Sequence, residues 1–229
     1  MPSSSTLLRI DASIHATESV TREVADTFER HWCESRPEGQ VVRRDVGLSP
    51  PPYLTELEHT AMFVPSEFRT PEQAAAQAEA AALADELFEA DTVLICAPLY
   101  NLGIPAGLKT WMDRIYTDIR LFPGFGFTQP LAGRRCVVVS ARGGAYGPGS
   151  RLDGWDYEQP FVRRHVVDIL GMDLSEIFID LTLAHINPKL AHLVDVAGQS
   201  RQAAHELAER LALEFADSDS EMDSDEGVA

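Results

Sequence analysis

Hydroxyl side chains are concentrated in one short segment of the chain, directly after an apolar run at Thr6–Ile10. Ser13, Ser19 and Thr21 lie in this segment, and a helical pattern begins immediately after it. A helix N-terminus presents unpaired N–H groups and the positive end of the helix dipole, so such a segment can bind a phosphate without a lysine. A purely structural role is equally open, in which Ser19 or Thr21 only caps the helix.

A second segment with chemical potential follows the most apolar run of the chain. It reads Pro98-Leu99-Tyr100-Asn101-Leu102, and a further proline stands at 105. Two prolines restrict the backbone, while a phenol and an amide accompany its free N–H and C=O groups. Such a loop is suited to holding a planar heterocycle. The alternative is a tight turn whose tyrosine packs against the body of the protein.

The third segment, Ala141-Arg142-Gly143-Gly144, again follows an apolar run. Paired glycines let a backbone approach a ligand closely, although they also occur in ordinary turns. Two common nucleotide motifs are missing from the sequence. It contains no Gly-x-x-x-x-Gly-Lys-Ser/Thr, and no Gly-x-Gly-x-x-Gly lies between the first strand and helix. These absences argue against a P-loop NTPase and against a Rossmann dinucleotide site.

Alternating strands and helices are expected to position these three segments. The apolar runs predict strands at 6–10, 40–44, 92–97, 136–140 and 177–181. The helical patterns predict helices at 20–32, 70–90, 108–119, 161–170 and 197–215. This order predicts an α/β fold: a flavodoxin-like, doubly wound, five-stranded parallel sheet with helices on both faces. Ligands of such sheets bind beyond the carboxyl ends of the strands, where all three segments lie.

Composition and charge exclude several functional classes. The 229 residues include 36 acidic and 19 basic residues, for a net charge of −17. An acidic surface repels nucleic-acid backbones, so no nucleic-acid partner is expected. Neither a membrane-spanning run nor a signal peptide is recognisable, which predicts a cytoplasmic protein without a membrane partner. Three distant cysteines do not form a disulfide framework, and no histidine motif indicates a metal site.

The end of the chain differs in composition from the rest. Residues 217–226 hold six acidic residues and no basic one. Such a segment lacks the apolar residues needed to pack. We therefore expect one domain over residues 1–215 and a disordered acidic tail over 216–229.

Together, the three segments resemble the FMN-dependent NADH-azoreductase family, which belongs to the flavodoxin-like quinone reductases. That family has a serine after its first strand, followed by Ser-x-Ser or Ser-x-Thr; this chain has Ser13 and then Ser19-Val20-Thr21. The family's Pro-Met/Leu-Tyr-Asn-Phe motif corresponds to residues 98–102, and its subsequent Pro, Leu-Lys and Asp to Pro105, Leu108-Lys109 and Asp113. Its Ser-Arg-Gly-Gly motif corresponds to residues 141–144. The resemblance extends over about residues 6–215.

The resemblance implies a homodimer with one FMN per subunit, located at the interface between the chains. It implies a ping-pong reaction, in which NADH reduces the flavin and a quinone or azo compound then accepts two electrons. The cofactor carries the chemistry, so no catalytic acid or base is assigned. The implied FMN contacts are Ser13, Ser19, Val20 and Thr21 at the phosphate, Pro98, Leu99, Tyr100, Asn101 and Leu102 along the ring, and Ala141, Arg142, Gly143 and Gly144 at its pyrimidine end.

Three departures from the family pattern concern the substrate side and the third motif. Leu102 replaces an aromatic residue, Ala141 replaces a serine, and residues 118–123 replace a Gly-x-Thr-Phe segment. Two other functions remain open at the level of the sequence. One is a non-catalytic, flavodoxin-type electron carrier, and the other is an FMN-binding regulatory module.

Overall fold

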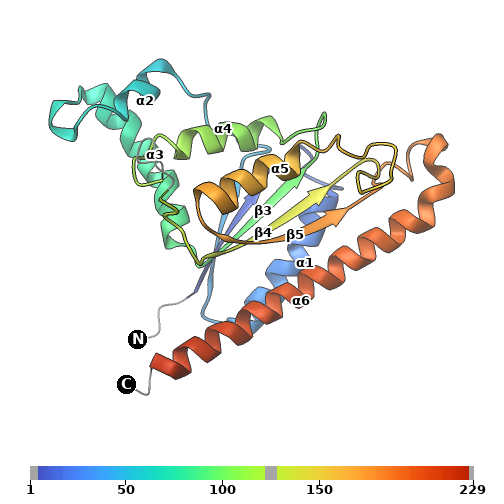
Figure 1. Cartoon of the computed structure of the whole chain (residues 1–229). Helices are drawn as coiled ribbons and strands as arrows, with labels where there is room; N and C mark the ends of the chain where they lie inside the picture. Colours follow the sequence, from blue (N-terminus) through green and yellow to red (C-terminus); the bar gives the residue numbers. More distant parts are fainter. Residues whose placement is uncertain (1–4, 122–127, 227–229) are drawn as a thin grey trace.

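The computed structural model describes residues 5–121 and 128–226, the last ten by their backbone. Its centre is a five-stranded, all-parallel sheet with the strand order β2-β1-β3-β4-β5 (Figure 1). The strands are β1 Thr6–Asp11, β2 Gln40–Asp45, β3 Thr92–Pro98, β4 Arg135–Ala141 and β5 Asp173–Ile179. This is the flavodoxin-like topology that the sequence predicts.

Helices cover both faces of the sheet (Figure 1). One face packs against α1 (Val20–Ser35) and α6 (Val194–Glu226), with Phe28 and Trp32 fully buried. The other face packs against α3 (Pro71–Glu89), α4 (Ala106–Ile115) and α5 (Glu158–Arg163). The central strand β3 is buried along its whole length, because both of its faces are covered. Cys96 and Cys136 are fully buried core residues.

Local sequence signals set several helix ends. Thr70 and Gln73 form a capping box at the start of α3, with Pro71 in the first turn. The helix α5 continues into a π-helical turn, η2 (Arg164–Ile169), and the chain leaves it at Gly171 with φ +79°. A left-handed residue at the end of a helix favours glycine.

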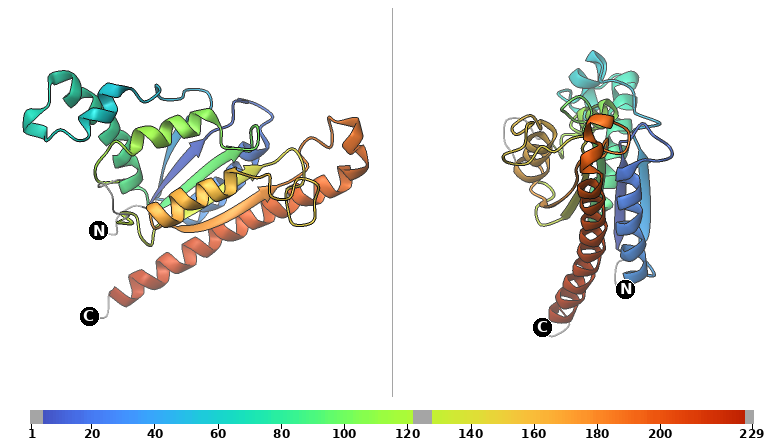
Figure 2. Two further views of the ribbon diagram at one scale, coloured as in Figure 1. Left: turned by 45° about the horizontal axis from the view of Figure 1, so that its top comes forward. Right: turned by 90° about the vertical axis from the view of Figure 1, so that its right-hand side faces the viewer.

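The segment between β2 and α3 extends away from the sheet (Figure 2). This surface excursion contains a short helix, α2 (Glu56–Ala61), and a 3-10 helix, η1 (Ser66–Phe68). Arg114, buried in α4, forms ion pairs with Glu58 of α2 and with Glu79 of α3, the latter at 2.7 Å. These ion pairs anchor the excursion to the body of the protein.

Several predicted boundaries differ from the structure, three of them by four residues or more. Strand β5 begins at Asp173, four residues before the predicted start, and its half-buried pattern is that of an edge strand. Helix α4 ends at Ile115 rather than at 119, because the Thr117 hydroxyl donates to the Arg114 carbonyl group in a tight turn. Helix α6 runs to Glu226, through most of the tail for which we expect disorder. No glycine or proline stands between Gly198 and Gly227 to end it.

A last 3-10 helix, η3 (Pro188–Leu193), joins the loop after β5 to α6. Within the described parts of the chain, no helix has both the length and the apolar character needed to cross a membrane.

Candidate active site

The loops after β1, β3 and β4 meet at one edge of the sheet. Asp11 pairs in register with Cys96, and Pro98 pairs with Ala141, so the three strands end close together. The strand order reverses between β1 and β3, which is where open α/β sheets bind their ligands. The fold therefore brings the three predicted segments to the predicted place.

A cavity of about 290 Å³, here called the loop cavity, lies between these loops. Nine of the predicted residues line it: Ser13, Ser19, Val20, Thr21, Pro98, Leu99, Tyr100, Ala141 and Gly143. Five further residues that the sequence does not single out also line it: His15, Glu18, Thr182, Leu183 and Ile186. The last three come from the loop after β5, which carries no recognisable motif.

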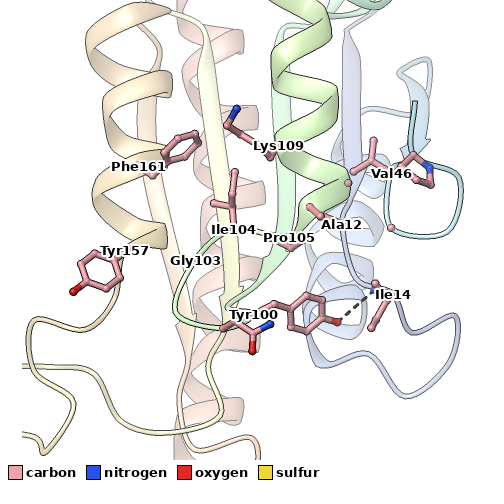
Figure 3. A pocket seen from close by; sticks show the side chains of 15 residues that line it. Ala12, Ile14, Val46, Tyr100, Gly103, Ile104, Pro105, Lys109, Tyr157 and Phe161 are labelled. Atoms are coloured by element: carbon pink, nitrogen blue, oxygen red, sulfur yellow. Dashed lines mark hydrogen bonds between the residues drawn. The ribbon is translucent and has the colours of Figure 1, made fainter. Parts of the chain in front are cut away.

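A larger cavity of about 780 Å³, here called the outer cavity, adjoins the first at Tyr100 (Figure 3). Asn101 lines it, together with Lys109 of α4 and Tyr157 and Phe161 at the start of α5. Its surface is mainly apolar, with Lys109 supplying a cation. A cavity with this lining can hold a flat aromatic ligand with polar substituents.

The tyrosine between the cavities joins two of the loops. The Tyr100 hydroxyl lies 3.5 Å from the Ser13 hydroxyl and accepts a hydrogen bond from the Ile14 backbone N–H at 3.4 Å (Figure 3). Ser13 is 2% exposed, and its hydroxyl accepts from the backbone N–H of His15 at 3.3 Å. The first and second loops are thus held together before any ligand binds.

Ser19 caps helix α1, which is the structural role considered for it in the sequence. Its hydroxyl accepts from the backbone N–H of Arg22 at 3.5 Å and so caps α1. It also lies 3.1 Å from the hydroxyl of Thr21, which is 1% exposed. Both residues line the loop cavity beside the helix N-terminus, so capping and anion binding are compatible here.

Arg22 is a structural residue that the sequence analysis misses. Its helical position suggests an exposed side chain, yet the guanidinium donates to the Ser13 carbonyl oxygen at 2.9 Å and pairs with Asp11 and Asp45 at 3.4 and 2.8 Å. Burial raises the pKa of Asp45, but hydrogen bonds from Arg22 and from the backbone of Leu48 and Gly47 outweigh it, so this pKa lies below its ordinary value. Arg22 thereby fixes the first loop against two strand ends.

The second loop contains a strained turn. Tyr100 and Gly103 exchange two backbone hydrogen bonds of 3.0 and 3.1 Å. Between them, Asn101 and Leu102 have φ values of +51° and +71°, in the left-handed region. Each such residue costs roughly 1–2 kcal/mol, and strain of this kind is often found at functional sites.

Three predicted ligand contacts, Leu102, Arg142 and Gly144, line neither cavity. The Leu102 carbonyl oxygen accepts from the backbone N–H of Tyr157 at 3.0 Å. The Arg142 guanidinium pairs with Asp156 at 3.0 Å and Asp180 at 2.6 Å. Arg142 therefore supports the third loop through its side chain. Of the predicted pair of glycines, Gly143 lines the loop cavity and Gly144 lines a neighbouring one.

A buried acid lies beneath the site. Glu158 of α5 is 1% exposed, and its carboxyl oxygens have no hydrogen-bond partner among the described residues. Burial raises the pKa of Glu158 to about 9; the nearby charge of Asp156 also raises this pKa, whereas Ser140 and Arg142 lower it. The side chain is neutral at pH 7.

The segment at residues 118–123, which differs from the family pattern, is described only as far as Leu121. Its remaining residues lie outside the described part of the chain.

Comparison with known proteins agrees with this geometry. Residues 5–211 match the model of a family described as having a flavodoxin-like fold. A Streptomyces avermitilis protein named FMN-dependent NADH:quinone oxidoreductase is 40% identical over 213 residues, covering 93% of this chain and 97% of the relative. A Parafrankia protein of the same name is 38% identical, covering 88% and 96%.

Solved structures show the same fold. The azoreductase AzrA has a TM-score of 0.75 and 25% identity, covering 91% of this chain and 99% of the other. An FMN-dependent NADH-azoreductase from Bacillus anthracis, solved in complex with FMN, has a TM-score of 0.72 and 22% identity, covering 90% and 99%. The family match and the relatives together show that the chain belongs to the flavodoxin-like family of FMN-dependent NADH:quinone oxidoreductases.

Proposed function

We propose that this protein is an FMN-dependent oxidoreductase that transfers two electrons from NADH to a quinone. The observation that carries the proposal is the loop cavity. Nine residues predicted from three separate motifs line it, and it lies where the strand order reverses. The names of the relatives support the same reaction.

The donors at one end of the loop cavity fit the FMN phosphate. Ser19 and Thr21 supply hydroxyls, and the first turn of α1 supplies N–H groups that have no partner within the helix. No lysine or arginine is among the described residues that line this cavity. Neutral donors and the helix dipole would therefore balance the phosphate charge, while Glu18 on the rim opposes it.

The other two loops fit the ring system. Leu99, Tyr100 and Asn101 form one wall, and Ala141 and Gly143 lie at the far end of the space. The hydrogen-bonded turn between Tyr100 and Gly103 holds this wall in a single shape. When bound there, FMN supplies the electron-transfer chemistry, and the loops supply its position and its shielding from water.

The outer cavity is the space for the acceptor. Its apolar surface, with Tyr157 and Phe161, favours an aromatic ring by stacking, while the charge of Lys109 is paired with Asp113 at 2.5 Å. Quinones fit this description, and aromatic azo compounds are a second acceptor class with the same features. Leu102, which replaces an aromatic residue of the family, affects acceptor binding through the shape of the turn, because its side chain does not line the outer cavity.

A second copy of the chain would complete the site. The outer cavity is open, and the excursion beside it exposes Tyr53, Phe63 and Phe68 by 79%, 64% and 74%. Exposed aromatic residues are enriched at interfaces between proteins. We infer a homodimer in which this excursion is the contact surface. A cytoplasmic location stays a prediction.

Steady-state kinetics tests the proposed function against an electron carrier. Purified protein should oxidise NADH rapidly when menadione is added, without any partner protein. A carrier or a regulatory module would bind FMN and show almost no turnover under these conditions, and that result would overturn the proposal.

A further inference from the structure

One residue contacts both ends of the first loop, which runs from the end of β1 to the start of α1. Ser13 and Ser19 stand at these ends, and both line the loop cavity. The backbone N–H of Arg22 donates to the Ser19 hydroxyl at 3.5 Å, and the Arg22 guanidinium donates to the Ser13 carbonyl oxygen at 2.9 Å. Only the second bond depends on the side chain. The arginine therefore ties one end of the loop to the helix that begins at the other end.

Carboxylates at the ends of two strands fix the guanidinium. It forms a bidentate ion pair with Asp45 of β2, with N–O distances of 2.8 and 3.0 Å, and lies 3.4 Å from Asp11 of β1. The Asp45 carboxylate also accepts from the backbone N–H groups of Gly47 and Leu48 at 3.1 and 2.9 Å. The Arg22 side chain is 15% exposed, so water competes little for these contacts. A planar guanidinium held in this geometry has a defined orientation.

The loop after β2 holds the Ser13 carbonyl group as well. A Cβ atom placed on Gly47 would lie 2.0 Å from the Ser13 carbonyl oxygen, so the glycine backbone packs directly on this group. The N–H of Gly47 donates to the Asp11 carbonyl oxygen at 3.0 Å. Residues outside the first loop therefore set the position of Ser13 before any ligand binds.

Charge alone does not explain how a phosphate would bind at this loop. No lysine or arginine is among the described residues that line the loop cavity, and Glu18 lies on its rim. The nearby charge of Arg22 is shared by Asp11 and Asp45. Binding must therefore depend on the placement of neutral donors, because hydrogen bonds weaken steeply when their distances and angles are wrong.

We propose that Arg22 is a positioning residue for the FMN phosphate, and that it acts by fixing the Ser13 end of the first loop relative to the N-terminus of α1. This inference rests on the proposed FMN site in the loop cavity. Arg22 itself is not among the described residues that line that cavity. Its substitution should weaken the binding of the phosphate group more than that of the flavin ring.

Riboflavin has the flavin ring without the phosphate, so the ratio of its Kd to the Kd of FMN isolates the contribution of the phosphate. Both constants are measured by fluorescence quenching on the full-length protein after removal of flavin, at one ionic strength. Arg22→Gln should lower this ratio by at least about tenfold, the equivalent of one hydrogen bond to a charged group. Arg22→Lys should give an intermediate ratio, because an ammonium group keeps the charge but lacks the planar fork. Arg43→Gln removes another ion pair between β2 and α1, to Glu29, and should keep the wild-type ratio.

Asp45→Ala separates placement from charge. It makes the surroundings of the site less negative and removes the carboxylate that orients Arg22. Placement predicts that the ratio falls, although the phosphate would then lie in a less negative environment. A rise in the ratio would show that Arg22 acts through its charge, and would overturn the proposal.

The wild-type values distinguish this inference from the proposed function. A wild type that prefers FMN, with an unchanged ratio in Arg22→Gln, would overturn the role of Arg22 and leave the FMN site intact. Equal losses of FMN and riboflavin affinity in Arg22→Gln give the same unchanged ratio and would make Arg22 a purely structural residue. A wild type that binds FMN no more tightly than riboflavin would contradict the phosphate site itself.

Discussion

The backbone N–H of Tyr157 donates to the carbonyl oxygen of Leu102 at 3.0 Å, which joins the start of α5 to the strained turn of the second loop. The preceding residue, Asp156, pairs with Arg142 at 3.0 Å and so joins the same helix start to the third loop. One short segment therefore holds two of the three loops of the proposed flavin site. Contacts with the start of α5 therefore help to fix the arrangement of these loops.

The strain at Leu102 predicts an unusual order of stability among variants. Leu102→Gly and Leu102→Ala both remove the side chain, but only glycine relieves the cost of φ +71°. We expect Leu102→Gly to be more stable than Leu102→Ala by about 1 kcal/mol in urea denaturation. At Ala82, an exposed helical position, alanine should instead be favoured over glycine by about the same amount. If alanine were favoured over glycine at residue 102 as well, the turn would be unstrained.

The buried acid Glu158 predicts a pH-dependent stability. Its pKa is about 9 in the folded protein, against an ordinary value of 4.5, so the folded state retains a proton that the unfolded chain releases. The contribution of this group to the free energy of unfolding therefore falls as the pH rises from 4.5 to 9. Glu158→Gln should raise the melting temperature at pH 8.5 and have little effect at pH 4.5.

Glu89→Gln, at an exposed glutamate of α3, is the control for the change of charge alone. Thermal unfolding of both variants across this pH range checks the prediction. Equal shifts in the two variants, or a Glu158→Gln effect that is largest at acidic pH, would contradict a neutral Glu158.

The sequence predicts the fold and the meeting point of the loops because both follow from local patterns. Apolar runs identify the strands, and parallel strands bring their carboxyl ends to one edge of the sheet. The roles of Arg22, Arg142 and Glu158 could not be predicted in this way. Each depends on partners brought close by the tertiary fold, and residue type alone does not reveal which partner is near.

One missed element had a local signal. Thr55 and Glu58 form a capping box that starts α2, and the Thr-x-x-Glu pattern is visible in the sequence. The contribution of the loop after β5 to the loop cavity had no such signal, because Thr182, Leu183 and Ile186 belong to no motif. These residues reach the loop cavity only through the pairing of β5 with β4.

The acidic tail is predicted to be dispensable. The last side chain of α6 with described packing is Phe215, whose ring lies 6.1 Å from that of Phe28 and whose carbonyl oxygen accepts from Arg135 at 2.7 Å. Deletion of residues 217–229 should therefore leave kcat and flavin content unchanged. Deletion from residue 214 onward also removes Phe215 and should lower the melting temperature. A loss of flavin in the shorter deletion would place the tail at the active site.

The hydroxyls of the first loop are predicted to determine FMN affinity. Replacing Ser19 and Thr21 together with alanine removes two hydrogen bonds to a charged phosphate, each worth roughly 1.5–3 kcal/mol. The dissociation constant for FMN, measured by fluorescence quenching, should rise by at least about 100-fold. Since Ser19 also caps α1, Thr70→Ala is the matched control, because it removes the cap of α3 away from both cavities. Equal affinities in the double variant and the wild type would refute the phosphate assignment.

The most direct test of the central claim is the visible absorbance of the purified protein during anaerobic titration. We predict one bound FMN per chain, loss of the oxidised flavin spectrum on addition of one equivalent of NADH, and its full return on addition of one equivalent of menadione. A protein that carries no flavin after incubation with FMN, or a flavin spectrum that NADH leaves unchanged, would contradict the account.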